Sequence, residues 1–157
     1  MVEQTEHSKP VRLAAAAFQA GLAGKWRAAE RAVQRIGDEC GEEGVNTAML
    51  AWCDTLIAHA SGEAGMAPRR IGIQFWHGET GELDAPGSQR VPAETQWAAR
   101  LLQARAAMDQ GAWIAACEDL PEDRLAIGQH VWAVLQLTVW QVNGLPSGYT
   151  RMGVGRG

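Results

Sequence analysis

One segment near the C-terminus constrains the fold more than any other part of the chain. Residues 125–144, LAIGQHVWAVLQLTVWQVNG, contain no charged side chain, and the charge-free run continues to Thr150. Its apolar residues lie on every side of a helical wheel, so the segment predicts a helix that is buried on all sides. Asn143 and Gly144, followed by Pro146, are typical of a helix end. We therefore expect the central helix of a small helical domain here.

The same segment is about as long as a membrane span, which needs roughly 20 mostly apolar residues. Polar side chains within it argue against insertion, because each is costly to bury in a bilayer. These side chains are Gln129, His130, Gln136 and Gln141. We therefore interpret the segment as a helix buried in protein, and we expect no membrane partner.

The composition agrees with one folded domain over residues 1–157, since 46% of the residues are hydrophobic and 20% are charged. The net charge of −4 excludes a global basic field for binding nucleic acid. The first ten residues, MVEQTEHSKP, lack the apolar run of a secretory signal. The three cysteines show no CxxC spacing. Together these features predict a cytoplasmic protein with reduced thiols.

Apolar residues recur at helical spacing along most of the chain, so the predicted fold is mainly α, with about six helices in two helical-hairpin halves. An acidic loop at Asp38–Glu43 is expected to separate the second helix from the third. The polar start at 1–9 and the glycine-rich end at 149–157 are expected to be flexible. The expected helices cover 11–23, 25–37, 43–60, 92–110, 112–120 and about 122–143.

Between the two halves the period of the pattern changes. Residues 69–77, RRIGIQFWH, alternate between apolar and other side chains, and GETG at 78–81 is typical of a turn. The alternation predicts a small β-hairpin over 69–84. A lone hairpin leaves an open edge that invites another strand, and tryptophan is common where proteins touch. We therefore place a partner-binding or self-association surface on this hairpin, at Arg70, Gln74, Trp76 and His77.

A short pattern, G-x-W-x-A-A, occurs at Gly24–Ala29 and again at Gly111–Ala116. In each copy the glycine is expected to end one helix, and the tryptophan of the next helix to pack back over it. The pattern resembles the helical-hairpin turn of tetratricopeptide repeats, G-x-[YW]-x-x-A, over Leu13–Ile36 and Leu101–Leu120. The resemblance implies a scaffold of stacked helices that binds partner peptides.

No motif for a nucleophile, a zinc site or a phosphate loop is present, so the sequence predicts no catalytic residue, no cofactor and no metal ligand. The acidic run at 38–43 lacks the alternating ligands of a hard-cation loop. The preferred function is a non-enzymatic cytoplasmic interaction or adaptor module that binds a protein partner.

Two alternatives stay open. The first is a small-ligand-binding or enzymatic domain with a pocket between the halves, near His130, Trp132 and Trp140. The second is a regulator associated with nucleic acid, which would use arginines of the first two helices; these are Arg12, Arg27, Arg31 and Arg35.

Overall fold

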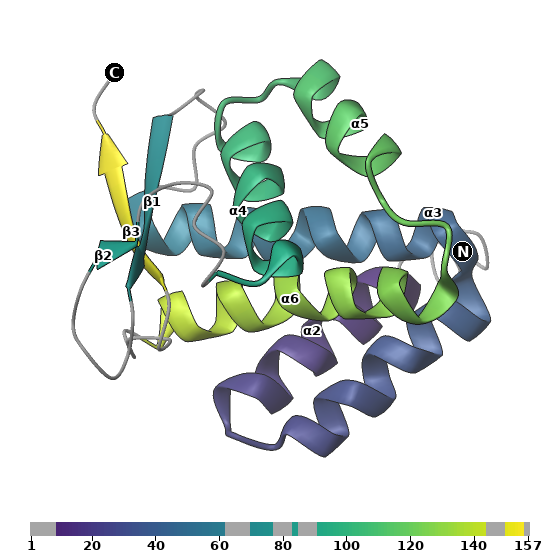
Figure 1. Cartoon of the computed structure of the whole chain (residues 1–157). Helices are drawn as coiled ribbons and strands as arrows, with labels where there is room; N and C mark the ends of the chain where they lie inside the picture. The colour runs from purple at the N-terminus through teal and green to yellow at the C-terminus, as the bar shows by residue number, and fades with distance from the viewer. Residues whose placement is uncertain (1–8, 62–69, 77–82, 85–90, 144–149, 156–157) are drawn as a thin grey trace.

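The fold is mainly α, as predicted (Figure 1). The computed structural model describes residues 9–61, 70–76, 83–84, 91–143 and 150–155. These ranges contain five helices and three strands. The helices are α2 (Lys9–Leu22), α3 (Trp26–Ser61), α4 (Ala93–Ala106), α5 (Gln110–Glu118) and α6 (Arg124–Val142). The strands are β1 (Arg70–Trp76), β2 (Leu83–Asp84) and β3 (Thr150–Gly155).

A tight turn joins α2 to α3. Gly24 adopts φ 75, a left-handed conformation that glycine accepts without a steric penalty. The N–H of Lys25 donates to the carbonyl oxygen of Ala20 at 2.8 Å, which closes the turn. Gly21, one turn earlier, allows a close approach, because a Cβ there would lie 3.0 Å from a methyl group of Val139 on α6. The turn and this contact dock the first two helices on the core.

A sharp kink divides α3 into two segments (Figure 1). The break is confined to Gly41, at φ 67 and ψ −165, and the residues on both sides of it are helical. The predicted acidic loop at Asp38–Glu43 is therefore wrong, and the two helices predicted on either side of it form one kinked helix, so the described residues contain five helices and not six. The physical reason is that one glycine redirects the backbone without a loop, while neighbouring carboxylates stay on exposed helical positions.

Helix α6 is the central helix, and it packs against α2, α3 and α4. Its second half is buried on several sides, and Leu135 and Val139 are 0% exposed. Thr138 is also buried, and its hydroxyl donates to carbonyl oxygens of its own helix. The first turn differs, because Leu125 is 71% exposed. The prediction of burial on all sides therefore agrees with the middle of the helix, where seven of the nine residues from Val131 to Val139 are buried, and is wrong for its start.

Three tryptophan indoles connect helices by hydrogen bonds. Nε1–H of Trp52 on α3 donates to the carbonyl oxygen of Ala14 on α2 at 3.0 Å. Nε1–H of Trp97 on α4 donates to the carbonyl oxygen of Ala116 on α5 at 2.7 Å. Trp113 on α5 donates to the side-chain oxygen of Asn46 on α3 at 2.9 Å. These side chains fill the core and also satisfy their polar atoms, as buried tryptophan requires.

The strands form a sheet of order β2-β1-β3 at one end of the helices (Figure 1). β1 pairs with β2 only at Phe75 and Trp76, whereas its antiparallel pairing with β3 runs from Arg70 to Phe75. The prediction of a self-contained hairpin is therefore wrong. A strand within the glycine-rich C-terminal segment supplies most of the backbone pairing of β1, and a two-stranded ribbon alone would be marginal.

Candidate functional site

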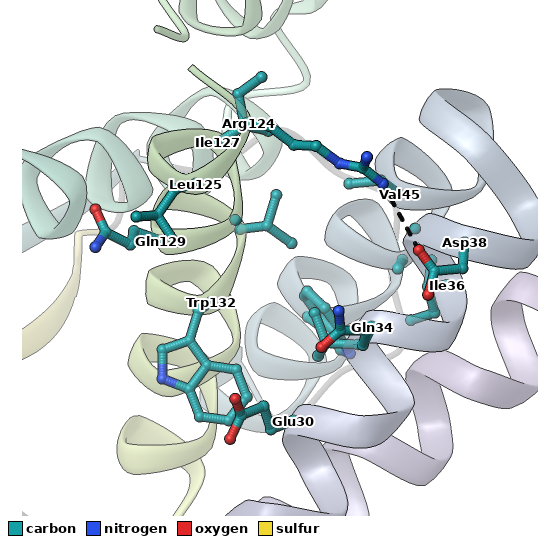
Figure 2. Close-up of a pocket in the computed structure, with 16 residues that line it drawn as sticks. Glu30, Gln34, Ile36, Asp38, Val45, Arg124, Leu125, Ile127, Gln129 and Trp132 are labelled. Atoms are coloured by element: carbon teal, nitrogen blue, oxygen red, sulfur yellow. Dashed lines mark ion pairs between the residues drawn. The ribbon is translucent and has the colours of Figure 1, made fainter. Parts of the chain in front are cut away.

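The main candidate site is a solvent-open groove of about 730 Å³ between the two segments of α3 and the first half of α6 (Figure 2). Its floor is apolar and includes Ile36, Trp52 and Val131, which are all buried. Its volume lies within the range of about 300–1,000 Å³ that is typical of ligand pockets. The kink at Gly41 shapes the groove, because the lining comes from both sides of it: Ile36 precedes the kink and Trp52 follows it.

The two walls differ in chemistry. The α3 wall carries polar residues spaced by four, which places them along one line of the helix; they are Glu30, Gln34 and Asp38. The α6 wall is mostly uncharged and is formed by Leu125, Ile127, Gly128, Gln129, Val131 and Trp132. One wall therefore offers hydrogen bonds and negative charge, and the other offers apolar area.

Different contacts connect the walls at the two ends of the groove. At one end Trp132 meets Trp26 edge to face, with ring centroids 5.7 Å apart. At the other end Arg124 reaches from α6 to Asp38, with 3.8 Å between the charged atoms (Figure 2). The guanidinium side chain is 95% exposed and the carboxylate side chain 58%, so this ion pair contributes little stability. We call the end at Trp132 the aromatic corner and the end at Arg124 and Asp38 the ionic bridge.

Two glycines lie within helices on opposite walls of the groove. A Cβ added to Gly37 or to Gly128 would meet no atom within 4 Å, and neither residue has a positive φ. Glycine inside an exposed helix costs about 1 kcal/mol relative to alanine. Nothing in the packing of the described residues requires glycine at these two positions. They leave the groove wider than alanine or larger residues would.

The residues of the predicted pocket separate in the structure. Of the three, Trp132 alone lines the groove. The ring of His130 lies edge to face with Trp97, with centroids 5.4 Å apart, and its Nδ1 is 2.7 Å from the carbonyl oxygen of Ala126. Trp140 lies against Trp26 at 6.1 Å. Sequence reasoning missed the α3 wall altogether, although its glycine inside a helical pattern was a usable signal.

The predicted contact surface on the hairpin falls on β1. Arg70, Gln74 and Trp76 belong to this strand, and His77 lies outside the described residues. β3 covers one edge of β1, and β2 covers the other edge only at its end. Partner binding at this strand stays a prediction.

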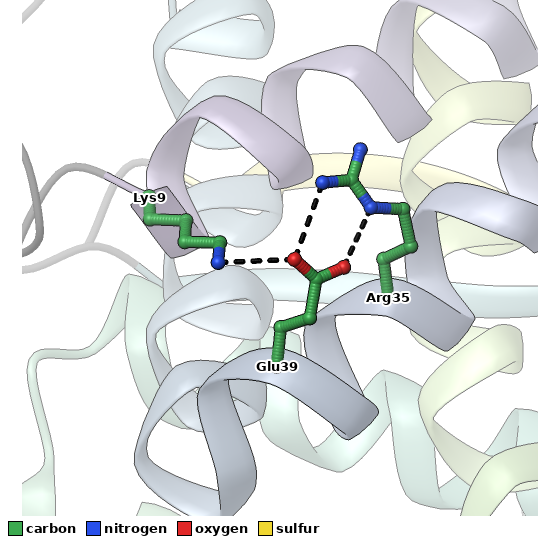
Figure 3. Close-up of polar contacts among 3 residues, drawn as sticks. All are labelled: Lys9, Arg35 and Glu39. Carbon is green, nitrogen blue, oxygen red and sulfur yellow. Dashed lines mark hydrogen bonds and ion pairs between the residues drawn. The ribbon is translucent and has the colours of Figure 1, made fainter.

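The arginines proposed for nucleic acid do not act as one group. Arg35 donates to Glu39 from Nε at 2.6 Å, and Lys9 lies 3.0 Å from the same carboxylate (Figure 3). These two donors, Arg35 first, lower the pKa of Glu39 to about 2. Arg27 and Arg31 are exposed on the first segment of α3, and Arg12 is exposed on α2. Intramolecular pairing therefore already neutralises one cation of the proposed set.

Three further ionisable side chains, Cys53, Asp54 and Arg105, lie together where α4 meets α3. Arg105 makes a bidentate contact with Asp54, at 2.7 and 3.0 Å, which connects α4 to α3. Burial raises the pKa of the neighbouring Cys53 thiol far above its usual range, so this thiol is unreactive. Among the described residues, no three histidine, cysteine or acidic side chains gather closely enough to hold a metal ion.

The comparisons with known proteins do not assign the chain to a family. No protein-family model matches the chain, and no curated protein and no solved structure matches it. The tetratricopeptide resemblance therefore depends on the local geometry alone. Trp26 does pack back on α2, since its ring would lie 3.2 Å from a Cβ on Gly21. Gly111, however, lies inside α5 and not in a turn, and the indole of Trp113 donates to Asn46 on α3. The two copies are therefore not structurally equivalent.

The structure also bears on the question of a membrane span. None of the helices that it describes combines the length and the hydropathy that crossing a bilayer requires.

Proposed function

We propose that this protein is a non-enzymatic interaction module of the cytoplasm that binds a helical segment of a protein partner in the groove between α3 and α6. The observation that carries the proposal is a solvent-open groove with a mostly apolar lining, which includes Leu125, the most exposed large hydrophobic side chain among the described residues. Exposed apolar concavities of this kind are typical of binding sites for partner side chains.

A helical ligand fits this groove better than an extended one. Both walls and the floor are helices, so no strand edge borders the groove to pair with an extended backbone. A helix satisfies its own backbone hydrogen bonds and needs to present only side chains. From Glu30 to Asp38 the α3 wall spans eight residues, or about 12 Å of helix axis, which matches roughly two turns of a ligand.

The test is to place larger side chains at the two glycines that line the walls of the groove. In Gly37→Leu/Gly128→Leu, both side chains enter open space and helix propensity rises, so the fold should be retained. A display library of amphipathic helices would be selected on the wild-type protein and then tested on this variant. The control is Ala115→Leu, at an exposed position of α5 away from the groove.

We expect the selected helices to bind the wild type and the control and to lose at least about tenfold in affinity for the filled variant. Equal binding to all three proteins would mean that the groove is not the binding site. Failure to select any helix would contradict the proposed function itself.

A further inference from the structure

We infer that the helix bound by the groove is basic, with a cation at each end of its apolar face. This inference deepens the proposed function and depends on it. Three observations carry it: a carboxylate at one end of the groove that has no partner among the described residues, an aromatic ring at the same end, and a weakly paired carboxylate at the other end.

The first cation position is the aromatic corner. Glu30 lines the groove and is exposed, and it makes no ion pair or side-chain hydrogen bond within the described part of the chain. It lies one helical turn after Trp26, whose ring contacts Trp132, so Glu30 and Trp132 share the same end of the groove (Figure 2). A carboxylate and an indole at the same end of a groove are a favourable combination for binding an ammonium or guanidinium group.

The second cation position is the ionic bridge. Within the described ranges Asp38 has only Arg124 as a partner, at 3.8 Å, and both side chains are largely exposed. A cation of the ligand can therefore replace Arg124 at little cost. Among the described residues that line the groove, Arg124 is the one cation against two carboxylates, so this lining has an excess of negative charge.

The spacing of the two positions defines the ligand. Glu30 and Asp38 are about 12 Å apart along the helix axis, so two cations seven or eight residues apart on a ligand helix reach both. The residues three and four positions after the first cation then face the middle of the groove, where apolar side chains meet Val33, Val45 and Ile127, the partly exposed apolar residues of its lining. The expected pattern is a basic residue, two apolar residues near the middle, and a second basic residue.

The experiment uses three synthetic helical peptides that share one alanine-rich scaffold and the same two leucines. They differ only in the flanking pair, which is lysine, glutamine or glutamate. Affinity for the full chain is measured by fluorescence anisotropy at low and at physiological salt. We expect the lysine peptide to bind at least about fivefold tighter than the glutamine peptide, with the glutamate peptide weakest, and the differences to shrink with salt.

Two variants make the test decisive. Glu30→Lys/Asp38→Lys should reverse the order of the peptides, and the exposed positions should tolerate the change. Trp132→Leu keeps apolar area but removes the ring, so it should weaken the lysine peptide more than the glutamine peptide. Equal binding of all three peptides, or preference for glutamate, would overturn this inference while leaving the groove function intact. Binding of none of them would contradict both the inference and the function.

Discussion

The sharpest test of the fold is to add a single methyl group at Gly44, by the substitution Gly44→Ala. This glycine is buried just after the kink of α3, and a Cβ there would lie 2.1 Å from the Cβ of Cys40. That atom is fixed to the backbone, so no side-chain rotation can move it away. The kink at Gly41 creates this overlap, because it brings two successive turns of α3 closer than a straight helix would. Gly44→Ala therefore forces the backbone to shift.

The size of the effect follows from two opposing terms. Overpacking a well-packed site costs up to about 3 kcal/mol, and replacing glycine by alanine in a helix returns about 1 kcal/mol. The net loss for Gly44→Ala is then about 2 kcal/mol, which lowers the Tm by about 4–8 °C in a chain of this size. The matched control is Gly37→Ala in the same helix, where nothing lies within 4 Å, and it should raise the Tm by about 2–4 °C.

Thermal and urea unfolding, followed by circular dichroism, are measured for both variants and for the double variant Cys40→Gly/Gly44→Ala. In Cys40→Gly/Gly44→Ala the clashing atom is removed, so the loss caused by the alanine should be much smaller than in the wild-type background. A double-mutant cycle of Cys40→Gly and Gly44→Ala should give a coupling free energy of at least about 1 kcal/mol. If Gly44→Ala is as stable as Gly37→Ala, or if the coupling is absent, the packing at the kink differs from the one described.

Three further outcomes are expected. The pKa of Glu39 is lowered in the folded protein, so its ion pairs should add stability above the unfolded pKa of about 4.3. This contribution should be lost as the pH falls toward 2. The free energies of unfolding of Glu39→Gln and of the wild type should therefore converge in acid. Trp97→Phe removes the donor to the buried carbonyl of Ala116 and should lower the free energy of unfolding by about 1–3 kcal/mol in urea titrations; an unchanged midpoint would contradict that bond. Leu135→Ala should cost about 2–5 kcal/mol by the same measurement, whereas Leu125→Ala, at an exposed position, should stay within about 0.5 kcal/mol.

The parts of the fold that were predictable from sequence depend on local physics. The central helix was expected from its apolar, charge-free pattern, and α6 covers Arg124–Val142. Its start coincides with a cap that acts within one turn, since the Asp123 carboxylate accepts from the N–H of Ala126. The short helix α5 begins in the same way at Asp109, which accepts from Ala112. Periodicity and capping involve neighbours in sequence, and neighbours in sequence are visible without a structure.

The parts that were not predictable depend on residues far apart in the chain. The acidic run at Asp38–Glu43 suggests a solvated loop, but Glu39 is held by Arg35 and by Lys9 from another helix. β1 suggests a hairpin because its nearest possible partner follows a short turn, whereas its longer pairing is with β3, about 80 residues later. The exposed start of α6 was missed because the pattern describes which residues are apolar and not what covers them.

The glycines in and near the groove show that one residue type can serve three physical roles within a few turns of helix. Gly41 is required by its positive φ, and Gly44 by the atom that faces it. Gly37 and Gly128 have neither reason, and they face the groove. Alanine at 41 or 44 should therefore lower stability, whereas leucine at 37 and 128 should raise or preserve stability and weaken binding. The proposed binding function gives these two glycines a role that packing does not, because they leave space in the groove for a ligand.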